Sequence, residues 1–328
     1  MRVYGWSNGT GGCGWYRVRE PLRGMQLAGI ETNWGPRLDD EIIQMHDTIL
    51  THILWQEEES EAWEILAKEN QHRLVFDIDD DIWQYHSSTK NAKHYTPEVL
   101  KRVERNISIA SLVTTPSEVL AERIIDKGLH DKVCILPNYV PAYLLEIERR
   151  TPRFFTIGYQ GAPQHQVDLE SIAVELFLFM KRHPNIRLRF YGPGEIYAPD
   201  WPMDRIQSIP WEPDVEKYYH SLSMHVGIAP LARFPFNEAK SGIRAVEYSA
   251  LGIPAVYSDL PPYREFVQDG ENGWLIRERE KKNWLRFLSS LYTRPELYNR
   301  MSIDARKKAA FWTTEYNSFQ WVGAYRSV

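Results

Sequence analysis

The residues best suited to chemistry lie between positions 237 and 256, where a glycine turn, two cations and a carboxylate occur together. Ser241 and Gly242 precede a segment with helical periodicity, and free N–H groups at a helix N-terminus favour a diphosphate. Lys240 and Arg244 add positive charge at that turn. Glu247 lies deeper along the same expected helix, where its carboxylate can accept hydrogen bonds from a ribose diol. This layout predicts a nucleotide-sugar site, although a capped amphipathic helix with exposed cations and one buried glutamate has the same local pattern.

A second candidate is the glycine loop that follows the first expected strand. Gly11 and Gly12 lie between that strand and a helix, where a backbone without side chains can approach a phosphate closely. The loop lacks the usual Gly-x-Gly-x-x-Gly register, and no lysine follows as in a P-loop. We therefore keep two interpretations, a phosphate-facing wall and a plain tight turn.

Four carboxylates stand at the end of another expected strand, at positions 77, 79, 80 and 81. Such a density of like charge suggests a metal, a basic partner, sugar hydroxyls or a raised pKa. Asp79 and Asp80 are the candidates for a reacting site. The alternative is structural, with Asp80 or Asp81 as the N-cap of a helix from position 82.

Two further loops follow expected strands in the second half of the chain. Gly161 and His165 come after the strand at 154–159, and Tyr191 and Gly192 end the strand at 187–191. All four are candidate nucleotide-binding residues because of a family resemblance that the residues at 236–275 carry. For the histidine the alternative is a surface or capping role, and for the Gly-Pro-Gly sequence at 192–194 it is a simple turn.

The elements that must position these residues alternate along the chain between strand and helix. Such alternation predicts parallel sheets covered by helices on both faces. The first set gives domain 1–150, and the charged segment 142–152 is the expected linker to the second set, domain 151–312. Strands are expected at 1–6, 49–55, 73–78, 111–115, 133–136, 154–159, 187–191, 224–229 and 255–257. Helices are expected at 15–28, 60–70, 97–110, 117–127, 169–183, 215–221, 241–251, 281–292, 295–311 and 313–328.

Composition agrees with two domains and excludes several classes of protein. The chain has 328 residues, of which 43% are hydrophobic and 25% charged, enough for two ordinary cores. Cys13 and Cys134 are too few for a disulfide framework, and no Cys/His cluster has the spacing of a zinc site. Without a basic-then-apolar leader or a run of roughly 18 apolar residues, the sequence predicts a soluble cytoplasmic protein. A net charge of −5 does not favour a dedicated nucleic-acid binder.

The stretch from position 236 to 275 resembles the donor-binding half of the retaining GT-B glycosyltransferases, the glycogen-synthase-like family 4 group. The residues that carry the resemblance are Asn237, Lys240-Ser241, Glu247-Tyr248, Leu251-Gly252-Ile253-Pro254 and Asp269-Gly270-Glu271-Asn272-Gly273. The closest similarity is to a divergent branch found often in phage and bacterial genomes. The resemblance implies two Rossmann-like parallel-sheet domains facing across a cleft, with the helix at 313–328 packing back on the first domain.

The family brackets its donor with a Glu-x7-Glu motif, in which the first Glu meets the sugar and the second the ribose. Glu247 matches the second, but the first should stand at position 239, which is Ala, and Glu238 is one residue away. A family histidine that contacts the donor sugar is replaced by the segment around Asp79 and Asp80. The Asp-x-Asp metal motif of the other large glycosyltransferase fold is rejected here, so neither a metal nor another cofactor is expected.

The resemblance implies transfer of a sugar from a nucleoside diphosphate sugar, with UDP favoured and the anomeric configuration retained. The acceptor is open, and a glycan, a small molecule and a modified DNA base are all candidates. A phage DNA-base glycosyltransferase would need a basic, aromatic surface on the first domain, for which the candidates are Trp15, Tyr16, Arg17, Arg19 and Arg23. An epimerase on the same fold and a non-catalytic nucleotide-binding module also stay open.

Overall fold

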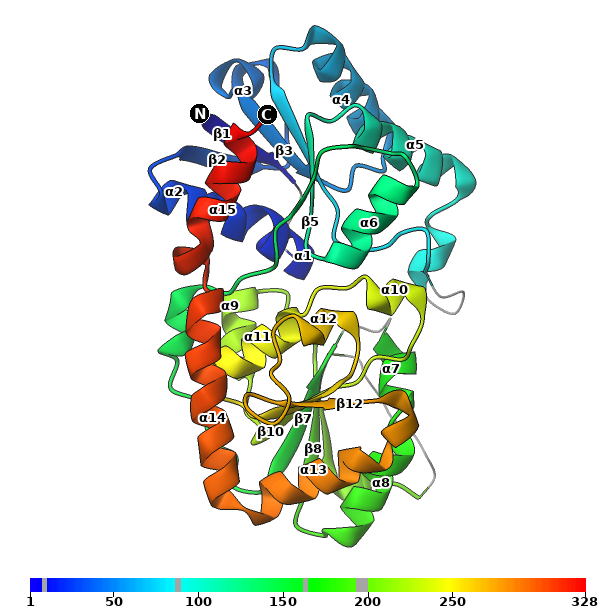
Figure 1. Ribbon diagram of the computed structural model, residues 1–328, viewed down its shortest axis with the longest axis vertical. Coiled ribbons are helices and arrows are strands. Elements are labelled where there is room, and N and C mark those ends of the chain that lie inside the picture. Colours follow the sequence, from blue (N-terminus) through cyan, green and yellow to red (C-terminus); the bar gives the residue numbers. More distant parts are fainter. Residues whose placement is uncertain (8–10, 86–89, 162–164, 193–199) are drawn as a thin grey trace. The chain divides into compact units, whose positions relative to one another are not determined.

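The computed structural model describes residues 1–7, 11–85, 90–161, 165–192 and 200–328 (Figure 1). The chain forms two compact units, each built from more than one segment of the sequence. Unit 1 comprises Met1–Pro141, Glu238–Ser241 and Thr313–Val328, and unit 2 comprises Ala142–Asn237 and Gly242–Trp312. Each unit contains one six-stranded sheet in which every pairing is parallel.

The sheet of unit 1 has the strand order β2-β1-β3-β4-β5-β6. The central strands are buried on both faces, and they carry apolar residues together with buried threonines in β3 and β5. The edge strand β2 is largely exposed. The strands run over Arg2–Trp6 (β1), Glu31–Gly35 (β2), Thr48–His52 (β3), Arg73–Asp77 (β4), Leu112–Thr115 (β5) and Val133–Ile135 (β6).

The helices of unit 1 cover this sheet, and the last helix of the chain packs beside α2 (Figure 1). The glycine loop leads through α1 into a five-residue π-helical segment, Trp15–Arg19, that continues directly into α2. The helices are Gly12–Gly14 (α1), Glu20–Leu27 (α2), Asp40–Met45 (α3), Glu57–Glu69 (α4), Pro97–Ser108 (α5), Glu118–Asp126 (α6) and Thr314–Arg326 (α15).

The sheet of unit 2 has the strand order β12-β11-β10-β7-β8-β9. Its strands are Thr156–Gln160 (β7), Arg187–Tyr191 (β8), Ile206–Ile209 (β9), Val226–Ala229 (β10), Ala255–Ser258 (β11) and Trp274–Ile276 (β12). Its helices are Gln166–Glu170 (α7), Ala173–Arg182 (α8), Val215–Ser221 (α9), Pro235–Glu238 (α10), Ile243–Ala250 (α11), Pro261–Arg264 (α12), Lys282–Thr293 (α13) and Pro295–Ala309 (α14). Helix α8 packs against α13, and α11 against α14.

In each sheet the chain adds strands first on one side of the first strand and then on its other side. This change of side, the switch point, predicts where a ligand binds. In unit 1 the chain adds β2 on one side of β1 and β3 on the other. In unit 2 it adds β8 on one side of β7 and β10 on the other. Ligands of open parallel sheets bind at the carboxyl ends of the strands at such a switch point. The loops after β1 and β3, and those after β7 and β10, are therefore the places to search.

The two parallel sheets predicted from the alternation are confirmed. The elements that were not predicted include the strands β2, β9 and β12, the helix α3 and the short helices α1, α10 and α12. The helix expected at 169–183 is split into α7 and α8. The expected linker at 142–152 begins with a 3-10 turn at Ala142–Leu145 that belongs to unit 2.

Candidate functional site

Glu247 lies at the centre of the candidate site in unit 2. Its side chain projects from α11 and is 4% exposed. The Nε2 amide of Gln160, the last residue of β7, donates a hydrogen bond to its Oε2 atom, and the Tyr218 hydroxyl lies 3.4 Å from the same oxygen. Burial, followed by the charge of Glu247, raises the pKa of Tyr218 well above its usual value, so that phenol remains a neutral donor. The buried carboxylate thus stands at the switch point of its sheet.

Gln160 presents a second acceptor beside that carboxylate. Because a carboxylate only accepts, the amide must turn its nitrogen toward Glu247, and its carbonyl oxygen then points elsewhere. That Oε1 atom is buried and has no hydrogen-bond partner among the described residues. A buried acceptor without a partner is costly, so such an atom marks a place where a ligand hydroxyl or N–H can bind.

Arg244 lies one turn before Glu247 on α11 and supplies the cation of this site. Its guanidinium lies over the Tyr159 ring, 5.4 Å from the centroid. Burial alone would lower the pKa of Arg244, but the surrounding phenols of Tyr159 and Tyr263 raise it above its ordinary value. Its Nη1 atom is buried and has no hydrogen-bond partner within the described part of the chain. A charged donor in this state is suited to an anionic oxygen.

The start of α11 requires a glycine at position 242. Gly242 is the N-cap, and a Cβ atom at this position would overlap the carbonyl oxygen of Pro262. The helix expected from position 241 begins at Ile243, so its first N–H groups belong to the residues that immediately follow Gly242. The absence of a side chain at Gly242 lets the first turn of α12 pack closely against the N-terminus of α11.

His165 is neither a surface residue nor a side-chain cap. It is 9% exposed, and its Nδ1 atom lies 2.7 Å from Oδ2 of Asp168. The buried Asp168 also accepts hydrogen bonds from Asn237 Nδ2 at 2.5 Å and from the Ala232 backbone N–H at 2.8 Å. These fixed donors hold the carboxylate, and the carboxylate orients the imidazole so that Nε2 is the ring nitrogen turned away from Asp168.

Gly161 and Gly192 pack against each other after β7 and β8. Gly192 has φ of +97°, which favours glycine, and a Cβ atom there would overlap the Gly161 carbonyl oxygen. The Tyr191 ring is buried, and its hydroxyl donates to the Ser223 carbonyl at 3.0 Å and accepts from the Ser223 N–H at 2.7 Å. The contribution of these loops beside a nucleotide would therefore come from backbone. Gly194, Pro163 and Gln164 lie outside the described residues.

Lys240 and Ser241 belong by their contacts to unit 1. The ammonium of Lys240 lies 3.4 Å from Oδ1 of Asp80, and the Ser241 hydroxyl oxygen accepts from Asn138 Nδ2 at 2.9 Å. Ala239, at the position of the family's first Glu, is fully buried in the apolar core of unit 1. Its neighbour Glu238 ends α10 and is partly exposed. The contact of Lys240, Ser241 and Glu238 with a donor remains a prediction.

A cavity of about 400 Å³ opens in unit 1 at the carboxyl ends of β1, β3 and β4. Gly11 and Cys13 of the glycine loop line it together with Asp79 and Asp80, whereas Gly12 begins α1 beside it. Gly9 lies outside the described residues. The other lining residues come mostly from the segments after β1 and β3: Trp6, Ser7, Gly14, Pro36, His52, Ile53, Leu54, Trp55, Gln56, Glu59, Tyr85 and Tyr95.

A histidine–aspartate pair lies in the wall of this cavity. His52 Nε2 is 2.8 Å from Oδ1 of Asp79. Burial opposes both charges, but each charge favours the other, so the pKa of His52 is raised and that of Asp79 is lowered. The negative charge of Asp79 raises the pKa of the nearby Cys13 thiol. The sequence predicted a chemical role for Asp79 but not its partner, which is 27 residues earlier in the chain.

The fourth carboxylate is buried away from the other candidates. Asp81 is 0% exposed, and its Oδ2 atom lies 3.2 Å from Arg123 Nη1. Burial raises its pKa to about 6, and Arg123 opposes that shift. The helix that Asp80 or Asp81 would cap is absent, since residues 82–84 form a turn. This structural interpretation of the acidic segment is wrong, because short turn hydrogen bonds to the carbonyls of Asp80 and Asp81 replace the cap.

The basic, aromatic surface required for a DNA-base acceptor does not form from the residues proposed for it. Trp15, Tyr16 and Arg17 are buried. Arg23 forms ion pairs with Glu20 at 2.9 Å and Glu315 at 2.7 Å, and Arg19 lies over the rings of Trp15 and Trp34. These candidates do not form such a surface because three of the five are buried and because Arg17 and Arg23 are paired with carboxylates.

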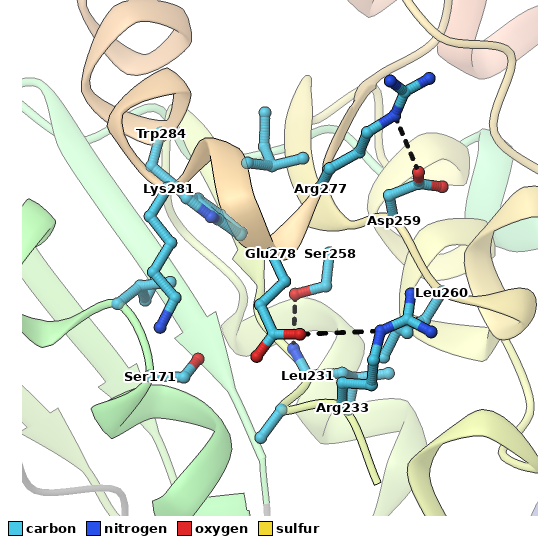
Figure 2. A pocket seen from close by; sticks show the side chains of 13 residues that line it. Ser171, Leu231, Arg233, Ser258, Asp259, Leu260, Arg277, Glu278, Lys281 and Trp284 are labelled. Carbon is cyan, nitrogen blue, oxygen red and sulfur yellow. Dashed lines mark hydrogen bonds and ion pairs between the residues drawn. The ribbon is translucent and has the colours of Figure 1, made fainter. Parts of the chain in front are cut away.

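A smaller hollow of about 60 Å³ lies at the carboxyl ends of β11 and β12 (Figure 2). Figure 2 shows Arg233 directed at Glu278 and Arg277 at Asp259, and both ion pairs measure 3.7 Å. Both arginines of the lining are thus paired with carboxylates, and the volume of the hollow is too small for a nucleotide. No group of three or more potential metal ligands occurs in the described ranges, nor does any helix there have the length and apolarity to cross a bilayer.

Comparison with known proteins gives the site a context. Residues 178–308, which include α11 and both Arg244 and Glu247, match the family model described as glycosyl transferases group 1. A Bacillus subtilis relative is 35% identical over 68 residues and a Haemophilus influenzae relative 27% identical over 152, and both are named as glycosyltransferases. The matches cover 21% and 44% of this chain, and the chain spans only 18% and 41% of those relatives.

Solved structures match over the whole length. Sucrose-phosphate synthase from Thermosynechococcus elongatus superposes with a TM-score of 0.71 at 14% identity, covering 100% of this chain and 99% of the other. HepE from Anabaena, in complex with UDP-glucose, gives a TM-score of 0.68 at 14% identity and covers 100% of both chains. At this identity the likeness concerns the fold. The chain therefore has the GT-B fold of these structures, and its residues 178–308 match the model of the glycosyl transferases group 1 family.

Proposed function

We propose that this protein transfers a sugar from a nucleoside diphosphate sugar, with UDP as the favoured nucleotide, to an acceptor hydroxyl with retention at the anomeric carbon. The observation that carries the proposal is the buried Glu247–Gln160 pair at the end of β7. A carboxylate and an amide carbonyl together offer hydrogen-bond acceptors for the two hydroxyls of a ribose. Support for UDP comes from HepE, the structural neighbour whose complex contains UDP-glucose.

The diphosphate would lie at the N-terminus of α11, next to Arg244. The first N–H groups of that helix and the Arg244 guanidinium both favour negative charge. When the bond from the anomeric carbon to the phosphate oxygen breaks, the charge that develops on the diphosphate is stabilised by these donors. In the sequence Lys240 and Ser241 come directly before Gly242, the N-cap of this helix, and their contact with a donor stays a prediction.

Bond formation then requires no nucleophile from the protein. The acceptor hydroxyl oxygen bonds to the anomeric carbon on the face that the diphosphate leaves, and its proton passes to the departing phosphate oxygen. Such a front-face reaction gives retention. His165, held by Asp168, supplies one further polar group at Nε2 in the same half of unit 2. No metal or other cofactor is part of this proposal.

The test begins with nucleotide binding by isothermal titration calorimetry, with UDP, GDP, ADP, TDP and CDP added separately to the whole chain. We expect UDP to bind best, and Glu247→Ala to weaken that binding at least tenfold, which corresponds to about 1.4 kcal/mol. Glu216→Ala is the matched control, because Glu216 is an exposed glutamate on α9 of the same unit. Circular dichroism checks that both variants fold.

A measurement of enzymatic turnover distinguishes a glycosyltransferase from a protein that only binds nucleotides. UDP release from UDP-sugars, with and without candidate acceptors, should depend on Glu247 and on Arg244. The fully buried Ala239 at the position of the family's first Glu favours one rival, a nucleotide-binding module without activity. Saturable UDP binding with no transfer or hydrolysis of any UDP-sugar would support that rival. If no nucleotide binds, the proposal is overturned.

A further inference from the structure

We infer that the cavity of unit 1 binds the acceptor and that this acceptor is a small uncharged or cationic saccharide, not a phosphorylated, carboxylated or nucleic-acid substrate. The inference rests on the proposed function, which it deepens by naming the class of acceptor. It is drawn from four properties of unit 1 alone: the position of the cavity, its carboxylates, its aromatic rings and, among the described residues that line it, the absence of lysine and arginine.

The position and size of the cavity suit a compact ligand. It lies at the switch point of the unit 1 sheet, where the loops after β1 and β3 diverge. Its volume of about 400 Å³ falls in the range of roughly 300–1,000 Å³ typical of small-molecule sites. One to two sugar rings would fill such a space, whereas the body of a polymer would remain outside it.

Its carboxylates are held in place and can only accept hydrogen bonds. Asp79 is fixed by His52 at 2.8 Å, and Oδ2 of Asp80 accepts from the Tyr85 hydroxyl at 3.0 Å. Glu59 adds a third carboxylate to the lining. Ionised carboxylates offer several lone pairs and no proton, so they match ligands rich in O–H or N–H donors.

Aromatic rings supply the apolar surface that a sugar ring needs. Tyr85 and Tyr95 stack on each other with centroids 5.3 Å apart, and both line the cavity. Trp55 is 36% exposed and packs edge-on against His94 at 4.1 Å, so its ring is fixed while part of it faces solvent. The C–H face of a pyranose can pack on such rings while its hydroxyls reach the carboxylates.

The charge of the wall selects against anions. The lining residues in the described part of the chain include three carboxylates and one histidine but no lysine or arginine. His52 is paired with Asp79, and Lys240 of unit 1 is paired with Asp80 at 3.4 Å. A phosphate brought into this cavity would meet negative charge at short range without a cation to compensate it.

The test measures saccharide binding to the whole chain in the absence of donor, by saturation-transfer NMR and calorimetry. The probes are methyl α-glucoside, maltose and glucosamine, compared with glucose 6-phosphate, glucuronate and a thymidine decamer. We expect saturable binding of at least one neutral or amino sugar, and binding at least tenfold weaker for every anionic probe. Trp55→Ala should weaken the sugar tenfold or more, whereas Trp211→Ala, which removes a 51% exposed tryptophan of unit 2, should not.

A second variant tests the effect of the negative charge of the cavity wall without a change in the shape of the cavity. Asp80→Asn keeps the size of the side chain and removes one negative charge, so the ratio of affinities for glucose and glucose 6-phosphate should fall several-fold. UDP binding to the same samples reports whether the proposed donor function stands, independently of the acceptor. If UDP binds but no neutral or amino sugar does, or if an anionic probe binds more tightly, the acceptor inference is overturned.

Discussion

At the scale of single residues, the strongest interaction in unit 1 was not predicted from the sequence. Arg17 is 2% exposed, and its Nε and Nη2 atoms bond both oxygens of Asp77 at 2.9 and 2.6 Å. Its Nη1 atom donates at 2.7 Å to both the Leu136 carbonyl and Oδ1 of Asn138. The partners lie 60 and more positions away, so no local pattern contains the pairing. From the sequence alone, Arg17 was instead a candidate for a basic surface.

Removal of one partner of the Arg17–Asp77 pair should lower the free energy of unfolding far more than removal of both partners. Arg17→Met leaves Asp77 buried without its cation, and we expect a loss of about 3–5 kcal/mol in the free energy of unfolding of unit 1. An Arg17→Met/Asp77→Leu double variant should recover much of that loss. Urea unfolding followed by tryptophan fluorescence measures both. Arg73→Met, at an exposed arginine near Asp47, is the control and should change stability by less than about 1 kcal/mol.

In the candidate site, too, residues close together in the sequence were predicted and their distant partners were missed. Glu247 and Arg244 were predicted because they share one helix with the glycine turn that precedes it. Gln160 was missed, although it bonds Glu247 directly, because 87 positions separate the two. His52 was missed for the same reason. Neither residue carries a distinctive sequence pattern, and only the placement of strand ends in a parallel sheet brings them to the site.

At the scale of elements, burial explains part of which strands could be predicted, although the largely buried β12 was missed and the less buried edge strand β6 was predicted. Strands β1, β3, β4 and β7 are buried almost throughout and give apolar runs that the sequence reveals. The edge strands β2 and β9 are mostly exposed, and their mixed residues look like loop. The helix expected at 169–183 is interrupted at Ser171 and Ile172, where the Ser171 hydroxyl donates to the Asp168 carbonyl. That local hydrogen bond competes with helix continuation.

The N-terminus of α11 provides a prediction at this scale. Gly242→Ala places a methyl group onto the Pro262 carbonyl, so the start of α11 or the first turn of α12 must move. We expect a loss of about 1–3 kcal/mol in stability and at least tenfold weaker UDP binding. Thermal unfolding and calorimetry measure the two effects. The control is Gly323→Ala in α15, where a Cβ atom meets nothing within 4 Å and helix propensity favours alanine.

A different result for this pair of variants would be informative. If Gly242→Ala binds UDP normally while its stability falls, the start of α11 has a structural role only, and the diphosphate must be held elsewhere. If both glycine variants are neutral, the close approach of Pro262 does not constrain the helix in solution. The Gly323 control also separates the helix-propensity gain of alanine from the steric cost.

At the scale of the whole molecule, each unit depends on segments that are distant in the sequence. Unit 1 takes its last helix from the C-terminus: α15 packs against α2, and Trp321 on α15 is 1% exposed. A Cβ atom at Gly24 would overlap the Trp321 ring, so α2 carries a glycine where that tryptophan packs. The Thr314 hydroxyl donates to Glu20, and Arg23 bonds Glu315 at 2.7 Å across the same helix pair. The chain must therefore pass through unit 2 before unit 1 is complete.

This dependence predicts that a change near the C-terminus destabilises the N-terminal sheet. Trp321→Ala removes a buried ring from between α2 and Tyr139, and we expect a loss of about 3–5 kcal/mol in unit 1. Phe319→Ala, on the same helix but 64% exposed, is the matched control and should have little effect. Hydrogen exchange should show faster exchange in β1 and α2 for Trp321→Ala, while β7 and α11 of unit 2 keep their protection. Equal loss of protection in both units would mean that they unfold together, and unchanged exchange in β1 would mean that α15 adds nothing to the stability of unit 1.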